Sequence, residues 1–212
     1  MSRYQAVDPV QLNANLTSIA DAIRAKNGTT DTLAFPDGFV NAINETPDYL
    51  EMRITDELTN YSNDKIAGVT EYGFAYCDNL ESVNLPNVNF INMYAFWNDS
   101  LLAEVNIPKV HTIGASAFER CSSIAKLDLP AVTNIGSYAF SEASALITLI
   151  LRKTDTVCTL NNANAFDNTP ISTGTGYIYV PSAMVDQYKA AENWSTFANQ
   201  IRAIEDYPDI TG

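Results

Sequence analysis

Apolar residues in the middle of the chain recur at a fixed spacing of 22 residues. The most regular is a phenylalanine, which occurs at Phe74, Phe96, Phe118 and Phe140, with a looser return at Phe166. A valine or isoleucine stands five residues before each of the first four rings, and a leucine or isoleucine stands six residues after each of them. A fixed period of this length is typical of a solenoid, whose repeats bury their apolar side chains only by stacking on one another.

Each repeat also predicts one short strand, in which polar and apolar residues alternate and the apolar ones face the core. The core-facing pairs are Val83 and Leu85, Val105 and Ile107, Leu127 and Leu129, and Leu149 and Leu151. Pro86, Pro108 and Pro130 follow three of these strands, and proline ends a strand because it has no N–H to donate. Successive strands should therefore form a parallel sheet, with neighbours about 4.8 Å apart. The opposite edge of each coil, typified by residues 113–118, is expected to turn at glycine and insert its ring between coils.

Two stretches of the repeat region carry a family resemblance. Residues 132–140 read Val-Thr-Asn-Ile-Gly-Ser-Tyr-Ala-Phe, and residues 118–130 read Phe-x-x-Cys-x-x-Ile-x-x-Leu-x-Leu-Pro. Both resemble the BspA-like leucine-rich repeat, over roughly residues 64–152 and more weakly as far as Pro181. The slot occupied by Cys77 and Cys121 holds Asp99 and Ala143 in the other two copies. The resemblance implies an α/β leucine-rich-repeat solenoid with a short parallel sheet on one face, irregular and 3-10 turns on the other, and helical caps at both ends.

Three regions are predicted along the chain. Residues 1–48 read as a helical N-terminal cap or anchor, residues 49–181 as the solenoid, and residues 182–212 as a C-terminal helical cap. The solenoid should contain about five repeats and a degraded first one, because Leu58 and Tyr61 stand 22 residues before their counterparts in the next repeat. In the last region we expect Ser182 to cap a helix that continues to Ile204.

The N-terminal region contains an apolar stripe with two possible uses. The stripe consists of Leu12, Leu16, Ile19 and Ile23. Its spacing fits a helix that packs on this chain or docks to a neighbouring protein, and equally the a and d positions of a coiled coil that makes a homo-oligomer. Residues 16–28 and the Phe-Pro-Asp-Gly-Phe string at 35–39 resemble a leader on virion-associated proteins of phages and prophages of Gram-positive gut bacteria. That resemblance implies a virion component.

Charge limits the possible partners. The 212 residues carry a formal net charge of −13, with 12 basic and 25 acidic residues and no basic run. Nucleic acids and anionic membrane surfaces are bound through clustered Lys and Arg, so we expect neither as a partner. No apolar stretch approaches the length of a membrane span, and the N-terminus lacks the pattern of a secretory signal. We expect synthesis in the cytoplasm and a final location in a virion, or at a cell surface or outside the cell, without a recognisable signal peptide.

Candidate catalytic and metal-ligating residues are sparse. His111 stands beside core Val110 without a serine or cysteine nucleophile motif near it, and reads as an exposed polar residue. Glu104 and Asp128 should face the same way from neighbouring strands, but carboxylates on an open surface lack the desolvation that separates the pKa values of a catalytic pair. The three cysteines read as buried packing residues. We therefore expect no enzyme activity, no cofactor and no metal site.

The outward positions of the predicted strands are the candidate ligand-binding residues. They run from small amides and mixed charges to an apolar and aromatic end. They are Asn84, Glu104, Asn106, Lys126, Asp128, Thr148, Ile150, Tyr177 and Tyr179. Amides and tyrosines together suit the recognition of a sugar or a protein. Alternatively, this face is merely a solvated surface, and the C-terminal helix covers the two tyrosines.

Two functions follow from these patterns. The first is a non-catalytic binding or adhesion module, phage virion-associated, that recognises a protein or glycan on a bacterial surface through the strand face. The second is a structural virion or assembly component, whose helices dock to other virion proteins and whose solenoid is a spacer. An open strand face favours the first function, and burial of that face by a neighbouring chain favours the second.

Overall fold

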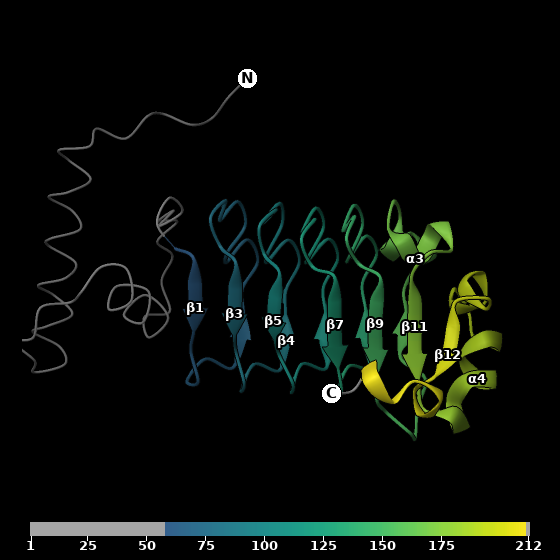
Figure 1. Ribbon diagram of the computed structural model, residues 1–212. Helices are drawn as coiled ribbons and strands as arrows, with labels where there is room; N and C mark the ends of the chain where they lie inside the picture. The colour runs from purple at the N-terminus through teal and green to yellow at the C-terminus, as the bar shows by residue number, and fades with distance from the viewer. Residues whose placement is uncertain (1–57, 211–212) are drawn as a thin grey trace, which may run out of the picture. The chain divides into compact units, whose positions relative to one another are not determined.

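The computed structural model describes residues 58–210, in which successive coils of chain stack side by side (Figure 1). Each coil contributes one strand to a front face and one shorter strand to a second face. The front strands are β1 (Asn60–Ser62), β3 (Ser82–Asn84), β5 (Glu104–Asn106), β7 (Lys126–Leu129), β9 (Thr148–Leu151), β11 (Tyr177–Val180) and β12 (Ile201–Ala203). All pair in parallel, so the predicted solenoid with a parallel sheet is confirmed. The predicted N-terminal helix with Leu12, Leu16, Ile19 and Ile23 lies outside the described residues.

The pairing register follows the 22-residue period. Val83 pairs with Val105 and Leu127 pairs with Leu149, while Tyr61 pairs with Val83. Tyr61 is buried, as is Leu58. The degraded first repeat therefore supplies a true first strand, as the offset of its apolar residues predicts.

The front face is not one continuous sheet, in contrast to the expectation. Strands β1, β3 and β5 form one sheet and β7, β9, β11 and β12 form another, and β5 does not pair with β7. Val105, at the seam, is half-exposed, although the period places it in the core. The coils on either side of the seam remain joined at the turns, where Tyr94 N–H donates to Ala115 O and Phe96 N–H to Ala117 O. The seam is therefore local to the front face.

The second face is a five-stranded sheet that the sequence analysis did not predict. Its strands are β2 (Gly68–Val69), β4 (Phe90–Ile91), β6 (Thr112–Ile113), β8 (Asn134–Ile135) and β10 (Thr159–Leu160). They pair in parallel without interruption, in the order β10-β8-β6-β4-β2. This sheet joins the coils on both sides of the seam.

The recurring phenylalanines form one stack through the core. The centroids of Phe74, Phe96 and Phe118 are 5.0 Å apart at each step, with ring planes within 4° of parallel. The stack continues to Phe140 at 5.8 Å and to Phe166 at 5.6 Å. Phe166 then contacts the rings of two C-terminal residues, Trp194 and Phe197. The rings fill the core and lie at the spacing of the coils.

Two glycines are required by the close approach of successive coils. A Cβ atom on Gly114 would lie 2.6 Å from Met93 N, and one on Gly136 would lie 2.5 Å from Ala115 N. Neither has a positive φ, but each begins a turn as expected, because Gly114 O accepts from Ala117 N–H and Gly136 O accepts from Ala139 N–H. Glycine is needed there because only a hydrogen atom fits against the neighbouring backbone.

The turn-rich edge of each coil contains two left-handed residues that are not glycine. One lies two residues before the phenylalanine, as Tyr72 and Tyr94 do, with φ of 56° and 57°. The other lies two residues after it, as Asn98 and Arg120 do, with φ of 64° and 65°. Both positions recur along the solenoid, so their side chains form straight rows from coil to coil.

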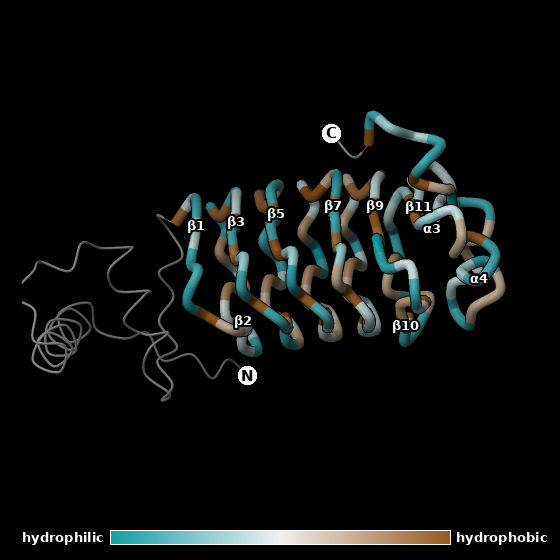
Figure 2. Tube along the Cα trace, turned by 90° about the horizontal axis from the view of Figure 1, so that it is seen from below, coloured by the Kyte–Doolittle hydropathy of each residue, from teal (hydrophilic) through white to brown (hydrophobic). Residues whose placement is uncertain are grey.

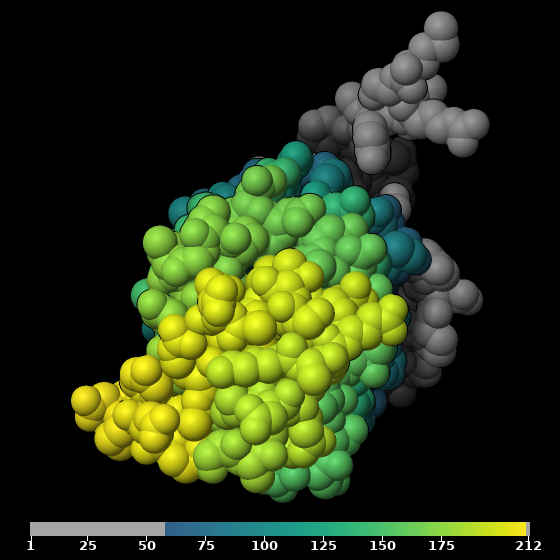
Figure 3. All heavy atoms as spheres, turned by 90° about the vertical axis from the view of Figure 1, so that its right-hand side faces the viewer, coloured from purple at the N-terminus to yellow at the C-terminus, as the bar shows by residue number. Residues whose placement is uncertain are grey.

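The C-terminal region departs from the predicted single helix. It consists of short helices and a strand: η2 (Ser182–Met184), α4 (Val185–Ala190), η3 (Trp194–Phe197), β12, η4 (Ile204–Asp206) and η5 (Pro208–Ile210). Two further short helices, η1 (Ala163–Phe166) and α3 (Pro170–Thr173), lie before β11 in the long fifth repeat. Helix α4 ends because Ala191 is extended and Asn193 has a φ of 62°. Ile201 then pairs with Ile178 of β11, so the last turn of the predicted helix is a strand. Ser182 does not cap by its side chain. Together these elements cover the end of the solenoid (Figure 3).

Candidate binding surfaces

The strand face divides into two halves at the seam between β5 and β7. The half made of β1, β3 and β5 is called the open half, and the half made of β7, β9, β11 and β12 is called the closed half. Both derive from the same outward positions of the repeat. Their side chains are arranged differently.

Side chains of the open half are hydrogen-bonded to one another along the solenoid. Asn106 Nδ2 donates to Asn84 Oδ1 at 2.7 Å, and Asn84 Nδ2 donates to Ser62 Oγ at 3.0 Å. A second ladder begins where Ser82 Oγ donates to Asn60 Oδ1 at 2.6 Å. Asn84, Glu104 and Asn106 are exposed. The open half is therefore a flat polar surface whose side chains are held in position before any partner arrives.

The C-terminal residues after β12 cover much of the closed half. Lys126 Nζ donates to the carbonyl oxygen of Ile210 at 2.6 Å, and the ring of Tyr207 lies 5.3 Å from that of Tyr179. The guanidinium of Arg202 lies 4.8 Å from the centroid of the Tyr177 ring. In Figure 2 the C-terminal segment lies above β9 and β11 on this face.

Two of the predicted ligand-binding residues are consequently not at the surface. Ile150 is 0% exposed and Tyr179 is 6% exposed, while Tyr177 and Thr148 are half-buried. The predicted apolar and aromatic patch at this end is therefore wrong. The alternative, in which the two tyrosines are covered, is correct. The residues that cover them, however, belong to β12 and the turns after it and not to a C-terminal helix. Burial also raises the pKa of Tyr179.

The carboxylates considered as a catalytic pair do not form one. The Arg152 Nε–H is shared between the two carboxylate oxygens of Asp128, at 2.9 and 3.0 Å, and Nη2 donates a further hydrogen bond to Oδ2. Glu104 lies on β5, across the seam from β7, and is exposed. Asp128 is thus paired with arginine, and this arrangement does not provide the coupled acid and base of a hydrolase.

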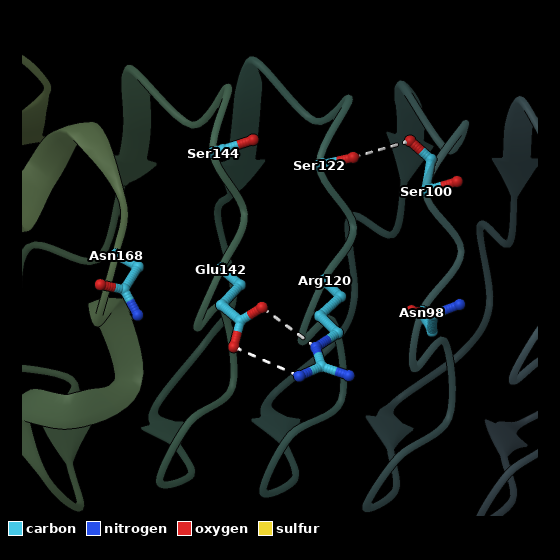
Figure 4. A pocket seen from close by; sticks show the side chains of 7 residues that line it. All are labelled: Asn98, Ser100, Arg120, Ser122, Glu142, Ser144 and Asn168. Carbon is cyan, nitrogen blue, oxygen red and sulfur yellow. Dashed lines mark hydrogen bonds and ion pairs between the residues drawn. The ribbon is translucent and has the colours of Figure 1, made fainter.

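The turn-rich edge carries a polar groove that the sequence analysis did not identify. Its lining comes from positions two and four residues after the recurring phenylalanine. The lining residues are Asn98, Ser100, Arg120, Ser122, Glu142, Ser144 and Asn168. Figure 4 shows them as two parallel rows, with the serines in one and the longer side chains in the other. The 22-residue period marks these positions, but the residue types there differ from coil to coil and do not indicate a groove.

An aromatic cluster adjoins the groove on the first two coils. Tyr72 stacks on Tyr94 with centroids 5.0 Å apart, and Trp97 contacts Tyr94 at 5.8 Å and Tyr76 at 4.8 Å. Tyr72 is 51% exposed. The next two coils carry Glu119 and Ser141 at the position of Trp97, and Tyr138 repeats the position of Tyr94 without a tryptophan beside it, so the cluster is confined to one end of the edge.

A buried carboxyl group lies between two of the cysteines in the core. Asp99 is 0% exposed, and its Oδ1 accepts from Cys77 N–H at 2.8 Å. Its Oδ2 has no hydrogen-bond partner within residues 58–210. Burial, opposed by the bond from Cys77, raises the pKa of Asp99 to about 8. Cys121, in the same slot one coil later, donates its thiol to Phe96 O, and burial raises its pKa as well.

The remaining candidate residues have the environments that their positions predict. Cys77, Cys121 and Cys158 are free and buried, and His111 is exposed. Within the described residues no group of three or more His, Cys, Asp or Glu side chains is placed to hold a metal ion. No helix in residues 58–210 has the length and apolar character to span a membrane.

Comparison with known proteins identifies the repeat and the fold. The pattern of the BspA type leucine rich repeat region matches residues 65–183 in six copies. A crystal structure of a leucine-rich repeat protein from Bacteroides ovatus superposes with a TM-score of 0.51 at 24% sequence identity. The match covers 69% of this chain and 36% of that chain, so this chain corresponds to about a third of the other protein's length. No curated protein is detectably similar in sequence.

Proposed function

Because the chain belongs to the BspA-type leucine-rich repeat family, we propose that it is a non-catalytic adhesion module whose open half binds a protein on a bacterial surface. Repeats of this kind commonly mediate protein binding and are generally non-catalytic. Solenoids present extended surfaces that suit such contacts. The observation that carries the proposal is the hydrogen-bonded ladder of Asn84 and Asn106, both exposed, beside the half-buried Ser82 and the exposed Glu104 on β3 and β5.

The physical support is preorganisation. Hydrogen bonds between side chains 22 residues apart fix the amides and the hydroxyl before binding. Ordering these side chains therefore costs little free energy when a partner binds. The closed half lacks this opportunity, because its outward side chains already contact the C-terminal segment. The open half is thus the favoured contact surface of the strand face.

A virion location is part of the proposal. Its support is the resemblance of residues 16–28 and 35–39 to a leader of phage proteins, and the adhesion function fits equally a protein displayed on a cell surface. A glycan is the alternative ligand for the open half. Antibodies against the purified chain, applied to induced phage particles and to intact cells, distinguish the two locations.

The decisive experiment measures the binding of fluorescently labelled chain to intact Gram-positive cells. Asn84→Arg with Asn106→Arg replaces two exposed amides with bulky charges and should reduce binding at least tenfold. Thr112→Arg is the matched control, since Thr112 is exposed on β6 in the second sheet. Protease treatment of the cells should abolish binding, whereas periodate treatment should leave it.

Either of two results would overturn this assignment. One is binding by the double variant that equals that of the unsubstituted chain. The other is binding that requires Asn84 and Asn106, survives proteolysis of the cells and is lost after periodate oxidation, which would make the ligand of the open half a glycan.

A further inference from the structure

The polar groove on the turn-rich edge has a regular geometry. Its first row contains Asn98, Arg120 and Glu142, each two residues after a core phenylalanine, and continues to Asn168. Its second row contains Ser100, Ser122 and Ser144. The rows run along the axis of the solenoid with the groove between them (Figure 4). The groove is shallow and open, with a volume of about 500 Å³.

Backbone hydrogen bonds fix the spacing along the groove. Asn98 N–H donates to Glu119 O and Arg120 N–H donates to Ser141 O, both at 2.9 Å, so each coil is bonded to the next at this position. The core rings below are 5.0 to 5.8 Å apart at each step. A ligand lying along the axis therefore meets one side chain from each row per coil.

The charges in the groove largely cancel. Arg120 Nε and Glu142 Oε2 form an ion pair at 3.0 Å, and the remaining lining groups are amides and hydroxyls. The pair is exposed, so its atoms remain available to a polar ligand beside it. Such a lining offers many hydrogen-bond donors and acceptors and little net charge. It suits a neutral ligand rich in hydroxyl groups.

An aromatic cluster lies at the N-terminal end of the same edge and begins one coil before the first residues of the groove. Tyr76 occupies the same position in its coil as Asn98 and Arg120 do in theirs, and it contacts the ring of Trp97. Trp97 in turn contacts Tyr94. Aromatic faces pack against the C–H faces of pyranose rings, which amides and hydroxyls cannot do. The edge thus combines the hydrogen-bonding rows of the groove with an adjacent aromatic cluster.

We propose that this groove is a second binding site, which holds an extended, neutral, β-linked polysaccharide chain along the solenoid axis. Each pyranose of such a chain advances by roughly one coil, so successive sugars meet equivalent pairs of polar side chains. An extended peptide fits less well, because its side chains on one face recur only every ~6.8 Å. The site lies on a different face from the open half and does not depend on the function proposed for it.

Calorimetric titration with defined oligosaccharides tests the site. The probes are cellohexaose and hexa-N-acetylchitohexaose, which are neutral, extended β-1,4-linked chains, and maltohexaose, whose α-1,4 linkages coil. The chain should bind at least one of the extended probes and bind maltohexaose at least tenfold more weakly. Arg120→Ala with Glu142→Ala should weaken the binding of the extended probe at least tenfold.

A matched control shows whether weaker binding results from the loss of groove residues or from the loss of any ion pair. Lys153 and Asp155 form another ion pair, outside the groove, and Lys153→Ala with Asp155→Ala should bind like the unsubstituted chain. Thermal unfolding of both double variants checks that they fold. Absence of binding to both extended probes, equal binding of maltohexaose, or unchanged binding by the groove variant would each overturn the proposal.

Discussion

The open and closed halves of the strand face come from the same repeat, yet only one of them faces solvent. In the open half, Asn84 and Asn106 are bonded to each other and exposed. In the closed half, Ile150 and Tyr179 occupy equivalent outward positions and are buried, and Tyr207, which follows the last repeat, packs against Tyr179. The period determines which residues point outward, whereas the C-terminal segment determines which of them remain accessible.

The core ring stack is shared by both halves, and breaking it should have the largest effect. Phe118→Ala removes a ring that is 0% exposed and lies between two others. We expect the free energy of unfolding to fall by about 3 to 5 kcal/mol, because a buried cavity replaces the ring. Chemical denaturation measures this, with Thr112→Ala as an exposed control expected within about 0.5 kcal/mol. A loss below about 1 kcal/mol for Phe118→Ala would contradict the role of the stack.

The buried carboxyl group of Asp99 should make stability depend on pH. The pKa of Asp99 is raised to about 8, so the folded chain keeps a proton that the unfolded chain releases near pH 4. The contribution of Asp99 to stability is then fully present below about pH 4 and falls as pH rises toward 8, by at most about 1.4 kcal/mol per pH unit. The equivalent position in a later repeat, which leads into the closed half, holds Ala143, which does not titrate and contributes no pH dependence.

Asp99→Asn tests this contribution by removing the titrating proton while keeping an oxygen for Cys77 N–H. The variant should gain stability relative to the unsubstituted chain at pH 9 and gain less, or lose, at pH 5. Urea denaturation at the two pH values measures the difference. A stability difference that is the same at both pH values would show that Asp99 does not titrate in this window.

Exposure of the closed half should have a smaller energetic effect. Tyr207→Ala removes the ring that contacts Tyr179, and edge-to-face aromatic pairs contribute about 0.5 to 1.5 kcal/mol. We expect a loss of that size in thermal unfolding and greater access of Tyr179 to solvent. Tyrosine nitration followed by peptide mapping reads the second effect directly. Unchanged protection of Tyr179 would mean that the segment remains in place without the ring.

The exposed ladder of the open half should contribute least to stability. Asn84→Ala removes two side-chain hydrogen bonds on a solvated surface, and the expected change is within about 0.5 kcal/mol. The substitution should nevertheless reduce cell binding, since the amide contributes to the proposed contact. A large destabilisation would instead make the ladder a structural element and weaken its proposed role in recognition.

Sequence alone predicts the parts of this fold that repeat. The phenylalanines, the core pairs of each front strand and the pairing of Tyr61 with Val83 all follow from one offset, because stacking requires equivalent residues to meet. The second sheet was missed because its strands are two residues long and are too short for an alternation to appear. The seam beside Val105 has no residue signal in the period.

The candidate sites were less predictable for a different reason. Coverage of Tyr179 depends on Tyr207 folding back from beyond the last repeat, which is a tertiary event with no periodic pattern. The groove depends on left-handed residues such as Arg120 and Glu142, where glycine would have been a recognisable signal. The outward residues of the front strands, by contrast, were placed correctly by alternation, including Asn84 and Asn106.

Because the coils are evenly spaced, the length of the solenoid can change by one whole coil at a time. Strand pairs at an offset of 22 residues recur in both sheets, backbone hydrogen bonds at an offset of 21 recur at the turns, and apart from the C-terminal segment each coil pairs with its immediate neighbours. Duplication or loss of one 22-residue segment would preserve every register and leave both ends of the solenoid unaltered. A lineage could thus lengthen or shorten the molecule, and with it the groove, without inventing a new fold.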